Sequence, residues 1–376
     1  MRGSHRLRWI TAVGFFILYG CLDPYAPPVG SDNVNFLMVD GFMDQQSARI
    51  QLSRAIPLSA PEDVYPAESG AEVAIETESG RSISVPEVNP GDYQLNGLQL
   101  NPASQYRLRI RTIAREEYLS DFISLKASPA IDSVTWRAEP EGVTIFVHTH
   151  DPLNQTRYYQ WSFEETWEYR SRIFSAYKIV NGTAILRNAD EDIHTCWNAQ
   201  PSSQIFTTST DKLKEDVVKN FPLAFLAKGS RKISRKYSIL VQQRALSLEA
   251  FEYYEQLKKN TENLGTLFDP MPSQLVGNVF NVNDATEPVL GYFAGGTVTE
   301  KRIFINFSEL PDFLRSVTPR FCEIDSIEVA NVKNYNEATL LGTAYGDVAI
   351  EGYITSTSDC IDCRLEGGNK NKPPFW

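Results

Sequence analysis

Short segments in which apolar and polar residues alternate follow one another from residue 36 to residue 113, with turn residues between them. Residues 48–53, 71–77 and 105–113 have the two-residue period of strands that bury one face. Asn89-Pro90-Gly91 and Asn101-Pro102 are turn signals. The pattern predicts a mainly β chain that begins with an antiparallel, immunoglobulin-like β-sandwich domain over residues 36–126.

A second, larger β-rich domain is expected over residues 130–376, after a boundary at residues 126–130. A helix is expected near residues 248–260, because Ser247 can cap it and apolar residues recur there at helical spacing. A shorter helix is expected at residues 212–219. Strand patterns in this domain occur at residues 131–136, 143–149, 158–168, 233–241, 276–282, 289–296 and 301–307.

The strand expected at residues 158–168 is the most aromatic in the chain. Tyr159, Trp161, Phe163 and Trp167 have the same parity, so they share one face of that strand. Such a face is either part of a core or a platform on which a ligand stacks. We therefore retain Tyr159, Trp161 and Trp167 as candidate ligand-binding residues.

The first residues predict export and lipid attachment. Three arginines precede a short apolar run that ends in Gly20-Cys21, which is typical of a signal peptide over residues 1–20. Leu18 and Gly20 fit a lipobox, in which the Cys21 thiol receives the lipid, although Tyr19 is larger than the usual residue. Residues 21–35, rich in proline, then form a stalk. The alternative is an ordinary secretory signal with a chance cysteine.

The charge balance excludes nucleic acid as a partner. The formal net charge is −11, and removal of the three signal-peptide arginines makes it −14 (−11 − 3). Such a surface repels nucleic acid and anionic lipid headgroups. The membrane is then reached through the N-terminal lipid. Beyond the leader, no run approaches the roughly 20 apolar residues that a transmembrane helix needs.

The cysteines other than Cys21 predict disulfides, because an exported chain leaves the reducing cytosol. Three pairings of these four are possible. We favour those in which the last two each reach back to a distant cysteine, because a bridge across their own short loop would stabilise little. A zinc site is the rival interpretation. The residues concerned are Cys196, Cys322, Cys360 and Cys363.

No catalytic residue, metal site or cofactor is predicted, because the chain has no nucleophile elbow, zinc-protease motif or phosphate loop. His148 and His150 would share one strand face, but no third ligand follows at a recognisable spacing. The basic run at residues 231–236 is interpreted as a solvated strand edge rather than an anion site. The aromatic end, Phe375-Trp376, is expected to dock back on the protein.

Several segments together resemble the Bacteroidota lipoproteins catalogued as domain of unknown function 4249. They are residues 21–25, 37–42, 52–54, 267–273, 277–279, 289–293, 359–363 and 373–376. The resemblance implies an outer-membrane lipoprotein encoded beside a TonB-dependent receptor-like barrel. It implies no catalytic residue.

The expected function is therefore that of a non-enzymatic binding or accessory subunit, lipid-anchored to the bacterial outer membrane on its periplasmic face or at the cell surface. A TonB-dependent outer-membrane barrel is the expected partner. The alternatives are an exported hydrolase whose site forms only in three dimensions, and a cell-surface adhesin or scaffold. The absence of any cleft that gathers ionisable groups would exclude the hydrolase. A fully buried aromatic face without any pocket would favour the adhesin.

Overall fold

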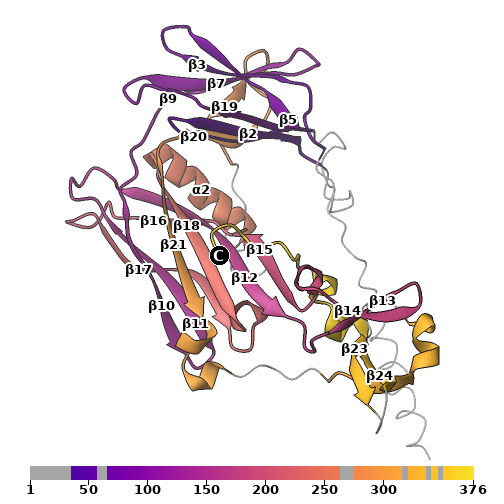
Figure 1. Cartoon of the computed structure of the whole chain (residues 1–376). Coiled ribbons are helices and arrows are strands. Elements are labelled where there is room, and N and C mark those ends of the chain that lie inside the picture. The colour runs from indigo at the N-terminus through magenta and orange to yellow at the C-terminus, as the bar shows by residue number, and fades with distance from the viewer. Residues whose placement is uncertain (1–34, 57–65, 263–274, 316–320, 336–339, 346–349) are drawn as a thin grey trace, which may run out of the picture.

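The computed structural model describes residues 35–56, 66–262, 275–315, 321–335, 340–345 and 350–376. The chain is mainly β and forms two β-sandwiches, a helix that lies between them and a smaller β lobe (Figure 1). No helix in these ranges is long and apolar enough to cross a membrane. The predicted signal peptide, Cys21 and nearly all of the predicted stalk lie outside the described residues.

The first sandwich consists of two sheets with the strand orders β20-β1-β2-β6-β5 and β19-β8-β7-β3-β4, and β9 pairs with β7. Alternate residues of its strands face a shared apolar core, as the two-residue period predicts. Its strands are β1 (Leu37–Met43), β2 (Ser47–Arg54), β3 (Glu72–Thr77), β4 (Ser82–Val85), β5 (Glu87–Asn89), β6 (Asp92–Asn96), β7 (Gln105–Arg111), β8 (Glu117–Ser120), β9 (Ile123–Ser124), β19 (Val279–Asn281) and β20 (Leu290–Gly295).

Two strands expected in the second domain belong instead to this first sandwich. β20 pairs in parallel with β1, and β19 pairs in antiparallel fashion with β8. Phe293 of β20 is fully buried in the first core. The prediction placed both strands by their position in the chain, because a strand pattern identifies no pairing partner. The chain therefore leaves the first sandwich near residue 126 and later returns to complete it.

Gly291 is the residue at which β20 approaches β1 most closely. Its φ is +144°, and a Cβ atom there would lie 1.8 Å from the backbone oxygen of Val39. Gly291→Ala is therefore expected to separate the two strands and to destabilise the first sandwich by about 3 kcal/mol. Hydrogen exchange of the β1 and β20 amides measures this effect, because both strands should lose protection.

The matched control is Gly342→Ala, since a Cβ atom at Gly342 would meet no atom within 4 Å. The tryptophans among the described residues lie in the second sandwich or dock on it, so their fluorescence should stay unchanged in Gly291→Ala. Full protection of β1 and β20 in that variant would contradict the pairing.

The second sandwich packs the sheet β10-β11-β17 against the sheet β15-β12-β18-β21, with β16 paired to β12. The prediction of a helix at residues 212–219 is wrong. Turns occupy its first half and strand β17 begins at Val217, because these residues pair with β11. The strands are β10 (Ile131–Glu139), β11 (Gly142–His150), β12 (Tyr158–Arg170), β15 (Thr195–Pro201), β16 (Phe206–Ser209), β17 (Val217–Ala227), β18 (Lys236–Ala245) and β21 (Val298–Asn306).

The helix predicted near residues 248–260 is confirmed as α2 (Leu248–Thr261). The Ser247 side chain caps it by accepting a hydrogen bond from the Ala250 amide at 3.2 Å. The helix packs between the sandwiches (Figure 1), where its Tyr253 ring contacts Tyr292 of β20. Because α2 follows β18 of the second sandwich and β20 belongs to the first, this buried contact links the two sandwiches.

The small lobe contains a hairpin, a three-stranded sheet and several short helices. Its strands are β13 (Tyr177–Val180), β14 (Thr183–Leu186), β22 (Ile324–Glu328), β23 (Leu340–Tyr345) and β24 (Ile350–Ser356). The short helices of the lobe and of the second sandwich are η1 (Ala189–Glu191), η2 (Arg231–Ile233), η3 (Phe307–Glu309), η4 (Asp312–Leu314), η5 (Val329–Asn334), α3 (Ser358–Ile361) and η6 (Cys363–Glu366).

The C-terminal end docks back on the second sandwich, as expected. Trp376 donates a hydrogen bond to Glu168 at 3.0 Å, and its ring packs edge-on against Phe304 of β21. Lys236 lies between these two rings, 4.5 Å from Phe304 and 4.6 Å from Trp376. The tail therefore covers part of the outer face of this sheet.

Candidate functional site

The aromatic row of β12 is part of the core. Tyr159, Trp161 and Trp167 are 0%, 1% and 8% exposed and face the opposite sheet. Tyr159 donates a hydrogen bond to Asp216 at 2.7 Å, and Trp161 donates one to Gln243 at 2.9 Å. The prediction that these residues form a platform on which a ligand stacks is therefore wrong, because the sheet β10-β11-β17 covers this face. Trp167, at the end of the row, lies beside the pocket described below.

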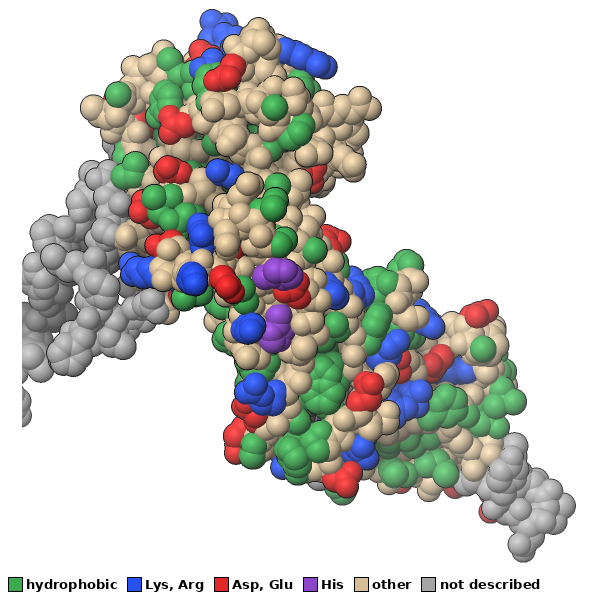
Figure 2. Space-filling model, turned by 90° about the vertical axis from the view of Figure 1, so that its left-hand side faces the viewer, with side chains coloured by type: hydrophobic (Ala, Val, Ile, Leu, Met, Phe, Trp, Pro, Cys, Tyr) green, Lys and Arg blue, Asp and Glu red, His purple; other side chains and the backbone are tan. Residues whose placement is uncertain are grey.

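The histidine pair lies on the outer face of β11. His148 shares a hydrogen bond of 2.8 Å with Thr135, and His150 contacts the Asp132 carboxylate at 2.8 Å. Figure 2 shows histidine side chains in the middle of this face, with acidic and basic side chains around them. The hydrogen bond to Asp132 raises the pKa of His150. Within the described ranges, no three His, Cys, Asp or Glu side chains gather as metal ligands.

A basic pocket opens where the end of β12 meets the start of β18. It has a volume of about 790 Å³, and residues from β12, η2, η3, η4 and η6 surround it. The floor includes the buried side chains of Ile233 and Leu314. Its rim carries five cationic side chains and one carboxylate, Glu366. The five cations are Arg170, Arg172, Arg231, Lys232 and Arg235.

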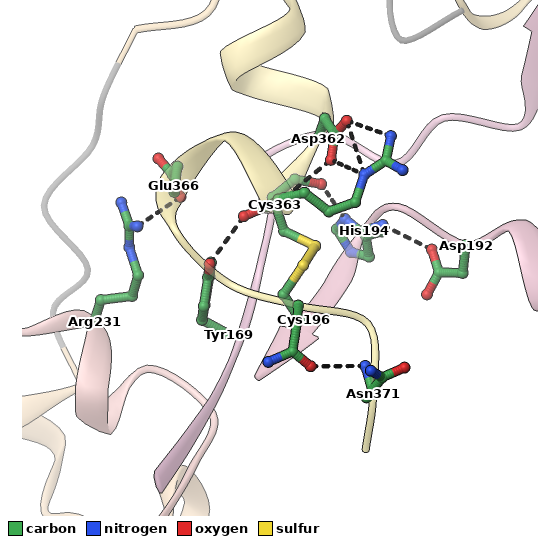
Figure 3. Close-up of a disulfide and its surroundings, with 12 residues drawn as sticks. Tyr169, Asp192, His194, Cys196, Arg231, Asp362, Cys363, Glu366 and Asn371 are labelled. Atoms are coloured by element: carbon green, nitrogen blue, oxygen red, sulfur yellow. Dashed lines mark hydrogen bonds and ion pairs between the residues drawn. A yellow bond between two sulfur atoms is a disulfide. The ribbon is translucent and has the colours of Figure 1, made fainter. Parts of the chain in front are cut away.

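Two of the five cations already have acidic partners and cover aromatic rings. Arg231 pairs with Glu366 at 2.7 Å and lies 5.1 Å above the Tyr169 ring. Figure 3 shows this arginine pointing at Glu366 across the pocket edge. Lys232 lies 4.9 Å above the Trp167 ring and pairs at 2.5 Å with a buried carboxylate, that of Glu165. One face of each of these two rings is thus covered by a cation.

The other three arginines have no side-chain ion pair or hydrogen bond among the residues that the structure describes. Arg170 ends β12, and Arg172 follows after Ser171, which turns inward and is 5% exposed. Both arginines line the pocket. Arg235 lines it from the position just before β18, and its backbone oxygen accepts a hydrogen bond from the Phe307 amide. We call Arg170, Arg172 and Arg235 the free arginines.

The positive field of the free arginines reaches His194, just outside the pocket. Burial lowers the pKa of His194, Arg170 and Arg235 lower it further, and Asp192 opposes them. His194 contacts the Ser171 hydroxyl through Nδ1 at 2.7 Å. The histidine is therefore neutral at pH 7 and close to the arginines that face the pocket.

A disulfide fixes the wall of the pocket that carries Glu366. Cys196 of β15 bonds to Cys363 of η6, and Tyr169 donates a hydrogen bond to the Cys363 carbonyl at 2.8 Å (Figure 3). Cys322 bonds to Cys360. Cys360 and Cys363 therefore each pair with a distant cysteine, as favoured from the sequence. Their thiols are consumed, which leaves none to bind zinc.

Sequence reasoning misjudged the basic run and missed Arg170, Arg172 and Glu366. The run at residues 231–236 lies beside a pocket instead of along a solvated edge. The feature that gathers these residues is the pairing of Glu168 with Lys236, which brings the end of β12 beside the start of β18. That register cannot be read from either strand alone.

The fold and the site define a mainly β protein with two sandwiches and a basic pocket on the second. A family model described as "Domain of unknown function (DUF4249)" matches residues 22–302, so the chain belongs to that family. No curated protein matches the chain. Among solved structures, the alpha chain of the chicken interferon gamma receptor is similar at 12% identity over 56% of this chain and 90% of that one. Its TM-score of 0.14 is too low to carry an argument.

Proposed function

We propose that the protein is a non-enzymatic binding subunit of the bacterial cell envelope, anchored by a lipid on Cys21, which holds an anionic ligand in its basic pocket. The observation that carries the proposal is the convergence of Arg170, Arg172 and Arg235 on one pocket without acidic partners among the described residues. The proposed partner is a TonB-dependent receptor-like barrel of the outer membrane, to which this subunit presents the ligand. The family resemblance supports that pairing.

The charge distribution supports an anionic ligand. The chain as a whole is acidic, with a formal net charge of −11, so a local group of uncompensated cations stands out against its surroundings. The like charges of the free arginines repel one another, and an anion between them removes that cost. A concave site also concentrates the field of its charges. Anions should therefore accumulate at this pocket although the whole chain repels them.

The alternative hydrolase rests on the contact between Ser171 and His194, and its geometry argues against catalysis. In a catalytic triad the histidine uses one ring nitrogen for the serine and the other for a carboxylate. Here Asp192 accepts a hydrogen bond from the backbone amide of His194, not from its ring. The Ser171 hydroxyl also donates to the Ile173 carbonyl at 3.1 Å. We assign this pair a structural role.

The adhesin or scaffold alternative required a buried aromatic face and the absence of any pocket. The aromatic face is buried, but the pocket exists. A ligand-binding role therefore fits these two observations better than a purely structural one.

The lipid anchor is tested by Cys21→Ser in cells. The variant is expected to leave the membrane fraction for the soluble one while it keeps the tryptophan fluorescence of the folded chain, because the tryptophans of the described residues lie in the second sandwich or dock on it. Fractionation followed by immunoblotting measures the change. Retention of Cys21→Ser in the membrane fraction would overturn the anchor.

The partner is tested by affinity purification of the full chain from detergent-solubilised membranes. An outer-membrane barrel should co-purify with the wild-type chain at a constant ratio. Purification of the chain alone, under conditions that keep other envelope complexes intact, would overturn the transport role.

A further inference from the structure

We infer that the ligand of the basic pocket carries a phosphate monoester on a hydroxylated body of sugar size. This inference rests on the proposed anion-binding function and names its chemical class. Its basis is the number of free cations, the shape of their charged groups, the volume around them and the polar groups that line that volume.

The number of unpaired charges selects a dianion. The pocket rim carries five positive side chains, and Glu366 and Glu165 neutralise Arg231 and Lys232, respectively. Three positive charges remain on Arg170, Arg172 and Arg235. A carboxylate or a sulfate monoester would compensate one of them, whereas a phosphate monoester carries a charge of about −1.5 to −2 at pH 7. The phosphate thus compensates most of the local excess.

The shape of the cationic groups also favours phosphate. Guanidinium groups present paired N–H donors in a fixed plane that match two oxygens of one phosphate. All three free cations are arginines, and they come from two separate places in the chain: the end of β12 with the segment that follows it, and the residue before β18. A tetrahedral group with three terminal oxygens can accept hydrogen bonds from more than one direction, which a planar carboxylate does less well.

The volume and lining of the pocket indicate a polar body beyond the phosphate. The pocket of about 790 Å³ is within the range of about 300–1,000 Å³ that is typical of small-molecule sites. Inorganic phosphate would leave most of it to water. Asn198, Ser230 and Ser234 add amide and hydroxyl groups to its lining. These groups suit the hydroxyls of a sugar.

The two aromatic residues that β12 contributes to the pocket argue against a ligand whose large ring system stacks on that side of it. Tyr169 and Trp167 are 1% and 8% exposed, and Arg231 and Lys232 already lie over their rings. A base or another aromatic group would have to displace a paired cation before it could stack on either of these two rings. Recognition through charge and hydrogen bonds requires no such displacement.

Calorimetry with defined probes tests the inference on the wild-type chain. Glucose 6-phosphate should bind more tightly than glucose 6-sulfate, glucuronate or inorganic phosphate, which differ from it in charge, anion shape or body. Vesicles with phosphatidic acid, compared with vesicles that contain phosphatidylglycerol, test whether the phosphate monoester is carried by a lipid. Binding of glucose 6-phosphate through the free arginines supports the inference. Binding of phosphatidic acid vesicles but not of glucose 6-phosphate would overturn the sugar-sized body and identify a lipid as the source of the phosphate monoester.

Variants locate the binding. Replacement of one free arginine, as in Arg235→Gln, should weaken the affinity for glucose 6-phosphate by about 10- to 100-fold, because a charge-assisted hydrogen bond is lost. The triple variant Arg170→Gln/Arg172→Gln/Arg235→Gln should abolish binding. Arg81→Gln, at an exposed turn of the first sandwich, is the matched control and should bind like the wild-type chain. Tryptophan fluorescence verifies that each variant is folded.

His194 provides a second readout that a structural effect would not reproduce. An anion between Arg170 and Arg235 compensates the charges that depress the pKa of His194, so that pKa should rise in an NMR titration. The signals of His148 and His150, on the outer face of β11, serve as internal controls. An unchanged His194 pKa at saturating glucose 6-phosphate would overturn binding in this pocket.

Failure of the phosphate inference can be distinguished from failure of the proposed anion-binding function. If glucuronate or glucose 6-sulfate binds as tightly as glucose 6-phosphate and equally requires the free arginines, the phosphate inference is overturned and the anion-binding function remains. If none of the anionic probes or vesicles binds to the folded wild-type chain, both are overturned.

Discussion

Replacement of Cys196 and Cys363 by alanine is expected to lower the free energy of unfolding of the second sandwich by about 5 kcal/mol in the chain-entropy description. The bond joins residues 167 positions apart and ties η6 to β15. Both cysteines are fully buried, so alanine also leaves a small cavity. Denaturant unfolding followed by tryptophan fluorescence measures the loss, since the tryptophans among the described residues lie in or on this sandwich.

The comparison is the double alanine variant of Cys322 and Cys360, which lie 38 positions apart. The same description gives about 4 kcal/mol for that bond. Its loss should loosen the small lobe and change tryptophan fluorescence less. Equal or smaller destabilisation of the second sandwich by loss of Cys196–Cys363 would contradict the role of this bond at the pocket wall.

Lys232→Met is expected to destabilise the second sandwich by about 3–5 kcal/mol, because it leaves the buried Glu165 carboxylate without its cation. The Glu165 side chain is 8% exposed and the Lys232 side chain 25%. Tyr237 would remain as a hydrogen-bond donor at 2.9 Å, since burial and the nearby Glu165 raise the pKa of its hydroxyl and keep it protonated. One neutral donor does not compensate a buried charge.

Two variants separate loss of the ion pair from loss of packing. Lys232→Met/Glu165→Gln should recover most of the stability, because no unpaired charge is then buried. Arg49→Met removes an exposed pair with Asp92 at 3.4 Å and should cost no more than about 1 kcal/mol. If the double variant is as unstable as Lys232→Met, packing of the lysine stem explains the effect and the charge argument is wrong. Denaturant unfolding measures all three variants.

Local features of the sequence were predicted well because their causes are local. The helix at residues 248–260 follows from a cap and a helical period, and both are satisfied within α2. The alternating strands of residues 36–113 form sheets whose buried faces match that period. The preference for distant partners of Cys360 and Cys363 held because the rejected bridge would have closed only a short loop.

Features that depend on which strands meet could not be predicted. β19 and β20 join the first sandwich although the strands β10–β18 and the helix α2 separate them in sequence from β9, because the pairing of β20 with β1 depends on three-dimensional closure. The parity of Tyr159 and Trp161 showed that they share a face, but not that a second sheet covers it. The basic pocket forms only where β12 and β18 lie in register.

Anomalous diffraction from crystals soaked in sodium tungstate tests the central claim most directly. Tungstate is a tetrahedral dianion that resembles phosphate, and its metal can be located without a model of the ligand. The account predicts a tungsten peak between the guanidinium groups of Arg170, Arg172 and Arg235, and no peak there in the triple glutamine variant. Occupied tungstate sites elsewhere on the chain together with an empty basic pocket would contradict it.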